Sequence, residues 1–561
     1  MDPNLRLARP LPALSGFLDI WSLIALSVVI VVLFPIVAVF WMALFPSEPI
    51  WLHLLSTVLP RYLFNSALLM VTVGVITGIM GTVAAWLVVM CSFPGRRVFE
   101  WALLLPLAVP AYIAAYALVD FWEYAGPAQT GLRQLFGWTS PSDYWFPAVR
   151  SRLGAILALS FSLYPYVYLL ARAAFRDQSA NALEVARTLG CGPWGRFFRV
   201  AIPLARPSIF GGLAIVMMET LNDFGAVDYF AVQTLTTGIF TTWLEASNRG
   251  GAAQIASLIL IVVLVLVLSE RSSRRRIRFY QASRKQRQSS SMPLRGLGAC
   301  GAVVACGFPV LLGFVMPVSI IISHALVRAE LWMEPSLWTA AVNSCLVSLS
   351  AGFLTVATAV LLVYGIRVSF KEGIATLAPL TTIGYAAPGV VLGLGVLIPV
   401  AALDHAVADA VLAVVGVDPG LLITGSGAAV VLACSIRFFA LAFAATDSAF
   451  GRLSPSLGDA ARSLGKSATG TLWRIYLPLV RGSLLTAGLL VFVDSVKELP
   501  ATLLLRPFGF DTLATRTYNY ASLENITGAS SAALMVVLVG LASVVVLAVV
   551  SSGPTPNPET R

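Results

Sequence analysis

The chain has 561 residues, of which 58% are hydrophobic and 11% charged, and its mean hydropathy is +0.85. A soluble domain carries about 25% charged residues, so this composition excludes an ordinary soluble enzyme, a disordered protein and a disulfide-rich secreted domain. Much of the net charge of +10 comes from nine basic residues between Arg271 and Arg295. Beside an apolar segment such a cluster is typical of a cytoplasmic loop, and we do not interpret it as a nucleic-acid site.

Twelve apolar segments follow in chain order, and each is long enough to cross the hydrocarbon core as a helix of about 20 residues. The first six are expected at about 17–44, 63–90, 100–121, 153–174, 206–225 and 252–269. The second six are expected at about 297–323, 340–366, 375–401, 426–447, 480–500 and 531–551. We therefore predict an all-α multi-pass membrane protein with about 12 transmembrane helices.

Basic residues indicate how these spans are oriented. Arg6 and Arg9 precede the first span, Arg96 and Arg97 follow the second, and the basic cluster follows the sixth. Lysine and arginine concentrate in cytoplasmic loops of membrane proteins. The distribution therefore predicts that both termini are cytoplasmic.

The sequence repeats itself at a fixed offset of 275 residues. The segment at 182–208 reads ALEVARTLGCGPWGRFFRVAIPLARPS, and the segment at 457–483 reads LGDAARSLGKSATGTLWRIYLPLVRGS. We predict two six-span halves at 1–269 and 297–551, joined by a basic linker at 270–296 and followed by a disordered tail at 552–561. Internal repeats of this kind place the transport pathway of a transporter at the interface between its halves.

The repeated segments form polar loops at about 176–205 and 451–480, on the predicted cytoplasmic side. Each begins with an acidic residue, small residues and an arginine, a run that favours a short helix ended by glycine. Such a helix suits docking into a groove of a soluble partner, whereas a single copy would fit an amphipathic interfacial helix equally well. Because the segment occurs twice with the same internal spacing, we favour docking to a partner over an amphipathic interfacial helix. The candidate docking residues are Glu184, Ala186, Arg187, Gly190, Pro203, Asp459, Ala461, Arg462, Gly465 and Pro478.

The spacing in these loops resembles a known family motif. The pattern Glu-x-Ala-x3-Gly-x9-Val-x-Ile-Pro at 184–203, repeated as Asp-Ala-Ala-x3-Gly-x9-Ile-x-Leu-Pro at 459–478, resembles the EAA motif of ABC importer permeases. The whole chain resembles the fused two-half permeases of ferric iron importers. The resemblance is closest in METLNDFGAVDYFAVQTLTTGIFTTW at 218–243 and VKELPATLLLRPFGFDTLATRTY at 496–518.

This resemblance implies a type I importer fold in a bacterial inner membrane and a transport subunit rather than an enzyme. Each EAA helix would sit in a cleft of one subunit of a cytoplasmic ABC ATPase dimer. ATP would be used by that partner, and this chain would bind no cofactor. A periplasmic substrate-binding protein would deliver the ferric ion, and a central cavity would alternate between outward and inward access.

Two pairs of acidic residues near the ends of the fifth and eleventh spans are candidates for the substrate pathway. Glu219 and Asp223 are four residues apart, as are Asp494 and Glu498, so each pair is expected on one helix face. Carboxylates in a membrane are costly and usually face a cavity or a partner. Because ferric iron prefers oxygen ligands, the four acids are a candidate transient relay without a stable metal site. The alternative is a structural role, with Asp494 bridging to Lys497 or with acids bonded to backbone at helix ends.

Three other functions compete with ferric iron import. An ion-coupled secondary transporter would use intramembrane acids to carry protons, but it has no use for paired docking loops. A membrane-embedded enzyme would need a cluster of catalytic residues, and the sequence shows none. Within the importer class, a permease for thiamine or a phosphonate is the alternative substrate assignment.

Overall fold

The computed structural model describes residues 20–46, 50–178, 180–275, 292–368, 376–454 and 456–552. Within these ranges ten helices are long and apolar enough to cross a membrane, or up to 12 if two bent helix pairs are each counted as one span. The expected all-α multi-pass fold is therefore confirmed. The long helices are α1 (Ile20–Leu44), α3 (Leu59–Met90), α7 (Arg152–Asp177), α10 (Ile202–Asn222), α13 (Arg249–Arg275), α16 (Pro335–Val368), α19 (Gly389–Val415), α24 (Leu477–Val496), α27 (Ile526–Ser552) and the continuous series α14 (Leu297–Val310), η5 (Leu311–Val315) and α15 (Met316–Val327).

Shorter elements connect the long helices. In the first half they are α2 (Trp51–Ser56), β1 (Cys91–Ser92), α4 (Arg96–Ala102), η1 (Leu105–Ala108), α5 (Ala111–Trp122), α6 (Pro127–Phe136), η2 (Pro141–Asp143), α8 (Ala180–Thr188), α9 (Pro193–Arg196), η3 (Phe197–Ala201), α11 (Gly225–Tyr229), α12 (Leu235–Phe240) and η4 (Thr241–Glu245). In the second half they are β2 (Met292–Pro293), η6 (Ala329–Met333), η7 (Ala378–Thr382), α18 (Ile383–Ala386), α20 (Ala428–Arg437), α21 (Phe439–Gly451), α22 (Ser456–Ser463), α23 (Ala468–Thr471), η8 (Leu472–Tyr476), α25 (Pro500–Leu505) and α26 (Leu513–Ser522).

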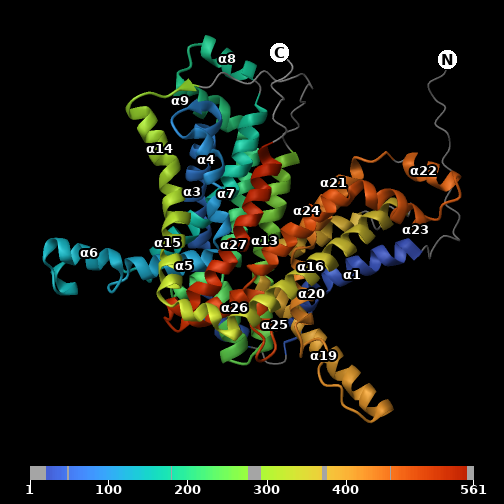
Figure 1. The fold of residues 1–561 in the computed structure, drawn as a ribbon. Coiled ribbons are helices and arrows are strands. Elements are labelled where there is room, and N and C mark those ends of the chain that lie inside the picture. The colour runs from blue at the N-terminus through green and yellow to red at the C-terminus, as the bar shows by residue number, and fades with distance from the viewer. Residues whose placement is uncertain are drawn as a thin grey trace, which may run out of the picture.

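The first helix of each half packs against the opposite half. At the start of α1, the ring of Trp21 lies 4.8 Å from that of Tyr364 on α16. In the reverse direction, Phe308 on α14 makes an edge contact at 5.7 Å with Phe161 on α7. Figure 1 shows the same exchange, with α1 beside α16 and with α14 and α15 beside α3 and α5. The two halves are therefore interlocked rather than side by side.

The third span of each half is broken, which differs from the continuous helices predicted at 100–121 and 375–401. In the first half the segments Arg96–Ala108 and Ala111–Phe136 meet at 93°. In the second half Pro388 separates α18 from α19. Pro110 and Pro388 have nearly the same backbone angles, with φ of −55° and −56° and ψ of 145° and 144°. Proline has no N–H and clashes with the preceding turn, so it ends one helix and begins the next.

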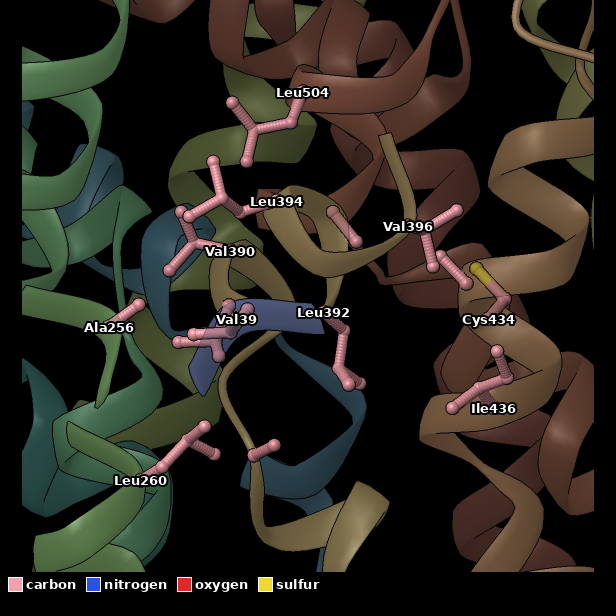
Figure 2. Close-up of a cluster of buried hydrophobic side chains, with 14 of the residues drawn as sticks. Val39, Ala256, Leu260, Val390, Leu392, Leu394, Val396, Cys434, Ile436 and Leu504 are labelled. Atoms are coloured by element: carbon pink, nitrogen blue, oxygen red, sulfur yellow. The ribbon is translucent and has the colours of Figure 1, made fainter. Parts of the chain in front are cut away.

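The largest buried apolar cluster lies where the halves meet. Figure 2 shows side chains from α1 and α13 of the first half beside side chains from α19, α20 and α25 of the second. Val39 and Ile255 are fully buried, and so are Val390 and Cys434. The cysteine acts here as a small apolar packing residue. This cluster fixes the relative positions of the two halves around the cavity described below.

The predicted linker and tail fall mostly outside the described residues. α13 extends to Arg275, beyond the predicted end of the sixth span at 269, while residues 276–291 and 553–561 lie outside the description. Next to the linker, β2 pairs in parallel with β1, with Cys91 opposite Met292. This short sheet ties the entry to the second half to the end of α3 in the first.

Candidate functional site: docking loops and central cavity

Each predicted docking loop contains a short helix that ends at a glycine. α8 carries Glu184, Ala186 and Arg187, and its chain reverses at Gly190, whose φ is +82°. The N–H of Cys191 donates to the carbonyl of Ala186 at 2.9 Å, closing a Schellman turn. Only glycine adopts such a positive φ without strain, which explains its place directly after the helix.

The second loop repeats this geometry at the same offset. α22 carries Asp459, Ala461 and Arg462, and Gly465 has a φ of +76°. The N–H of Lys466 donates to the carbonyl of Ala461 at 3.0 Å. Figure 1 shows α8 and α22 on the same side of the molecule, one on each half and away from α25 and α26.

Both short helices turn their alanine inward and their charges outward. Ala186 and Ala461 are buried, whereas Glu184 and Arg187 are exposed. On α22 the guanidinium of Arg462 pairs with Asp459 at 2.7 Å, with both side chains more than half exposed. Such exposed pairs add little stability, so the charges are available to a partner.

The docking loops pass directly into the long helices α10 and α24, whose other ends border the cavity described below. Pro203 and Pro478 are the second residues of α10 and α24, each within a longer helix that begins before it. A single π turn precedes each proline, η3 in the first half and η8 in the second. The continuous helices run from Trp194 to Asn222 and from Ala468 to Val496, and the 21 residues of α10 alone extend about 30 Å.

Two exposed leucines beside the docking glycines were not selected from the sequence. Leu189 is 78% exposed and Leu464 is 80% exposed, and the 275-residue offset relates the two positions. Isolated apolar side chains are common on protein surfaces, but the same leucine in both copies is a repeated feature. The internal alignment contains this signal, because leucine precedes the glycine in both segments.

At the other ends of α10 and α24, all four predicted acids line one cavity of about 180 Å³. Its wall also includes Tyr112 and Tyr166 from the first half and Tyr385 from the second. The two acidic pairs therefore converge on one cavity, and their role as a transient relay stays a prediction. Among the described residues, no three His, Cys, Asp or Glu side chains are arranged to hold a metal ion together.

Two of these acids, Asp223 and Glu498, accept hydrogen bonds from backbone N–H groups at the starts of short helices. The sequence did not indicate which of the four acids would do so. The Oδ1 of Asp223 accepts from the N–H groups of Ala226 and Val227 at 3.0 and 3.1 Å, which caps α11. Glu498 occupies the matching position and accepts from the N–H of Ala501 at 3.1 Å, at the start of α25. The expected alternative of backbone bonding at helix ends therefore applies to these two residues.

The other two acids are less constrained. Glu219 and Asp494 occupy matching positions on α10 and α24; Glu219 interacts electrostatically with Arg437 and then with Asp494, and Asp494 interacts first with Lys497. In the described part of the chain neither carboxylate forms a hydrogen bond or an ion pair. Their oxygens are therefore the acceptors in the cavity that remain available to a ligand.

The cavity also contains two cations that sequence reasoning missed as site residues. Arg437, at the end of α20, pairs with Glu498 at 2.6 Å, and both side chains are largely buried. Lys497 donates to the carbonyl of Leu107 at 3.0 Å and interacts electrostatically with Asp494. A charge inside the apolar segment predicted at 426–447 was a signal for Arg437, because such residues face cavities or partners.

Lys497 and its counterpart Asn222 both reach across to the opposite half. Lys497 donates to η1 of the first half, and the amide of Asn222 donates to the carbonyl of Ala386 in α18 at 3.5 Å. Both acceptors lie just before the proline that breaks the third span. The residue preceding each capping acid thus connects its own half to the broken span of the other.

The repeated halves, the paired docking helices and the charged cavity between them define a membrane transport permease. A family model described as "Binding-protein-dependent transport system inner membrane component" matches residues 74–279 and 374–552, which together are more than half of the chain. The chain belongs to this family of ABC importer permeases, and the two matches correspond to its two halves. It is a multi-pass membrane protein and a transport subunit, and in this family the ATPase is a separate subunit.

Curated relatives transport different substrates. The Fe(3+)-transport system permease protein FbpB 2 of Haemophilus influenzae is 24% identical over 483 residues, which cover 85% of this chain and 87% of the relative. The molybdenum transport system permease protein ModB of Escherichia coli is 29% identical over 181 residues, covering 31% of this chain and 76% of the relative. The sulfate transport system permease protein CysT of E. coli is 26% identical over 193 residues, or 33% of this chain and 66% of the relative.

Proposed function

We propose that this chain is the permease of an ATP-driven importer that moves ferric iron into the cytoplasm of a bacterial cell. A periplasmic binding protein delivers the ion, and a cytoplasmic ATPase dimer binds α8 and α22. The docking loops and both termini lie on the cytoplasmic side, as the basic residues beside the spans indicate. ATP binds to the partner subunits, and this chain needs no cofactor of its own.

The two docking helices support a common mechanism of coupling. Each presents exposed charges and one exposed leucine, Leu189 or Leu464, to a partner groove. Closure of an ATPase dimer draws the two helices together, and α10 and α24 transmit this movement to the cavity. Since Glu219 and Asp494 lie on these same two helices, ATPase closure changes the distance between them.

The pair formed by Glu219 and Asp494 is the observation that carries the substrate assignment. The two carboxylates come from equivalent positions, face one cavity and have no hydrogen-bond donors of their own among the described residues. Ferric iron is a hard cation that prefers carboxylate oxygen. With four carboxylates and two cations in its wall, the cavity has a formal net charge of −2, which attracts cations. A relative that covers most of the chain is a Fe(3+) permease.

An oxyanion is the second candidate substrate, because Arg437 and Lys497 also line the cavity. Arginine and lysine bind tetrahedral anions through charge-assisted hydrogen bonds. The relatives named for molybdenum and sulfate transport fit this alternative over about a third of the chain. The pairing of Arg437 with Glu498 argues against it, since that guanidinium is already neutralised.

Uptake by the reconstituted complex tests the assignment. The permease, its ATPase and its binding protein are placed in proteoliposomes, and accumulation of labelled ferric iron, molybdate, sulfate, thiamine and a phosphonate is measured with and without ATP. We expect ATP-dependent accumulation of ferric iron alone. ATP-dependent uptake of another substrate without ferric iron would overturn the substrate while retaining the permease function.

A further inference from the structure

We propose that the first half carries a binding site for one anionic phospholipid, in a groove between α3 and α10. The groove has a volume of about 550 Å³ and an almost wholly apolar wall. It is lined by Val71, Gly74, Val75, Gly78, Ile79, Thr82, Val83, Phe197, Phe198, Ile202, Ile209, Leu213 and Met217. Its length along α10, from Ile202 to Met217, is about 22 Å at the rise of an α-helix.

The groove lies on the outer surface of the membrane-spanning region rather than between the halves. Val71, Val75 and Ile79 follow one another at four-residue spacing on α3, and each is more than half exposed. In the hydrocarbon core such a row contacts lipid chains. The side chains of Met217 and Leu213 on α10 pack onto Gly74 and Gly78, where an added Cβ would lie 3.5 and 2.9 Å from them, and they form the floor of the groove.

An exposed cation lies beside the groove, between the lining residues Ile202 and Ile209. Arg206 is exposed and lies four residues after Ile202 and three before Ile209, so it shares the groove-lining face of α10. Among the described residues it forms no hydrogen bond or ion pair. An arginine at this depth extends its guanidinium towards the membrane surface, where it meets headgroup phosphates. The apolar groove and this charge together fit one acyl chain and one anionic headgroup.

The second half provides an internal comparison. Arg481 is exposed at the position equivalent to Arg206. There, however, α16 and α24 approach closely, because a Cβ built on Gly352 would lie 3.2 Å from the carbonyl oxygen of Gly488. The position of Leu213 is thus occupied by glycine in the second half. The same cation is present in both halves, but in the second half α16 and α24 approach closely at Gly488, seven residues along α24 from Arg481.

Native mass spectrometry of the full-length permease, incubated with an equal mixture of phosphatidylglycerol and phosphatidylcholine, tests the site. We expect Arg206→Gln to reduce retained phosphatidylglycerol at least threefold, while Arg481→Gln leaves it unchanged. Equal losses in both variants would overturn the proposal, since general surface charge would then explain the binding.

A second pair of variants tests the groove itself. Val75→Trp fills it from a lipid-exposed position, and we expect retention of phosphatidylglycerol to fall as in Arg206→Gln. Leu349→Trp, at an exposed position on α16 one helical turn before the equivalent of Val75, is the control in the second half and should have no effect. Undiminished lipid retention in Val75→Trp would also overturn the proposal, because the acyl chain would then lie elsewhere. Thermal stability of each variant confirms that it is folded.

Discussion

The two halves of the chain share one backbone plan but differ in the charges that they bring to the cavity. The first half contributes Ser162 where the second contributes Arg437, and Asn222 where the second contributes Lys497. α7 is continuous at Ser162, whereas the equivalent span bends by 52° between α20 and α21, at Arg437. The docking helices and the free acids are repeated, while the cations are not. The two halves therefore match in their short helices and in their cavity acids, and they differ in the cavity cations.

The comparison predicts that one capping acid is far more critical for stability than its counterpart. Glu498 is buried and paired with Arg437, so Arg437→Met leaves a buried carboxylate without its cation. We expect the free energy of unfolding to fall by about 3–5 kcal/mol. Unfolding in detergent measures the change. The double variant Arg437→Met with Glu498→Gln should recover most of the lost free energy of unfolding. If Arg437→Met alone were as stable as the unmodified protein, the ion pair would contribute little to stability.

The two docking loops should respond alike, in contrast to the cavity. Gly190→Val and Gly465→Val force a β-branched residue into positive φ, at a cost of about 1–2 kcal/mol each. We expect membrane insertion to persist while co-purification of the ATPase and substrate uptake fall. Gly192→Val is the matched control, because a Cβ there meets no atom within 4 Å and φ is not positive. Normal ATPase binding in the Gly190 and Gly465 double variant would remove these glycines from coupling.

Asp223 should behave as a helix cap rather than as half of an ion pair. Asp223→Ala removes the acceptor for two N–H groups of α11, and the expected cost is about 1 kcal/mol. Asp223→Asn keeps an acceptor oxygen and should retain most of the stability. Thermal unfolding of the two variants side by side separates capping from charge. A larger loss for the asparagine variant would show that the charge itself is required.

Cutting the chain near Ser289 should have the smallest effect. The cut falls outside the described residues, and each half keeps six predicted spans and one docking loop. Because α1 and α14 each pack on the opposite half, the separately expressed halves should still associate. Co-purification of one tagged half with the other measures assembly. Absence of the complex with both halves present in the membrane would contradict two separable units.

The internal repeat of the sequence predicted those site residues that occur in both halves. The 275-residue offset identifies the docking glycines and relates Glu219 to Asp494 and Asp223 to Glu498, and all four acids line the same cavity. It does not reveal which acids cap helices, because that depends on the orientation of the following short helix. Arg437 was missed because its partner is 61 residues away, and no local spacing links them. The packing of α1 against the second half could not be predicted either, because the sequence of an apolar span does not indicate which helices it contacts.

Uptake by the variant Glu219→Gln with Asp494→Asn tests the central claim most directly. If these two carboxylates pass ferric iron through the cavity, accumulation of labelled iron should fall by at least about tenfold, the change that about 1.4 kcal/mol produces. Thermal stability and ATPase binding are measured beside uptake, because Asp494 interacts electrostatically with Lys497 and Glu219 with Arg437, although neither acid forms a hydrogen bond or an ion pair within the described ranges. Unchanged iron accumulation in a stable double variant would contradict the role of these acids as the cation pathway.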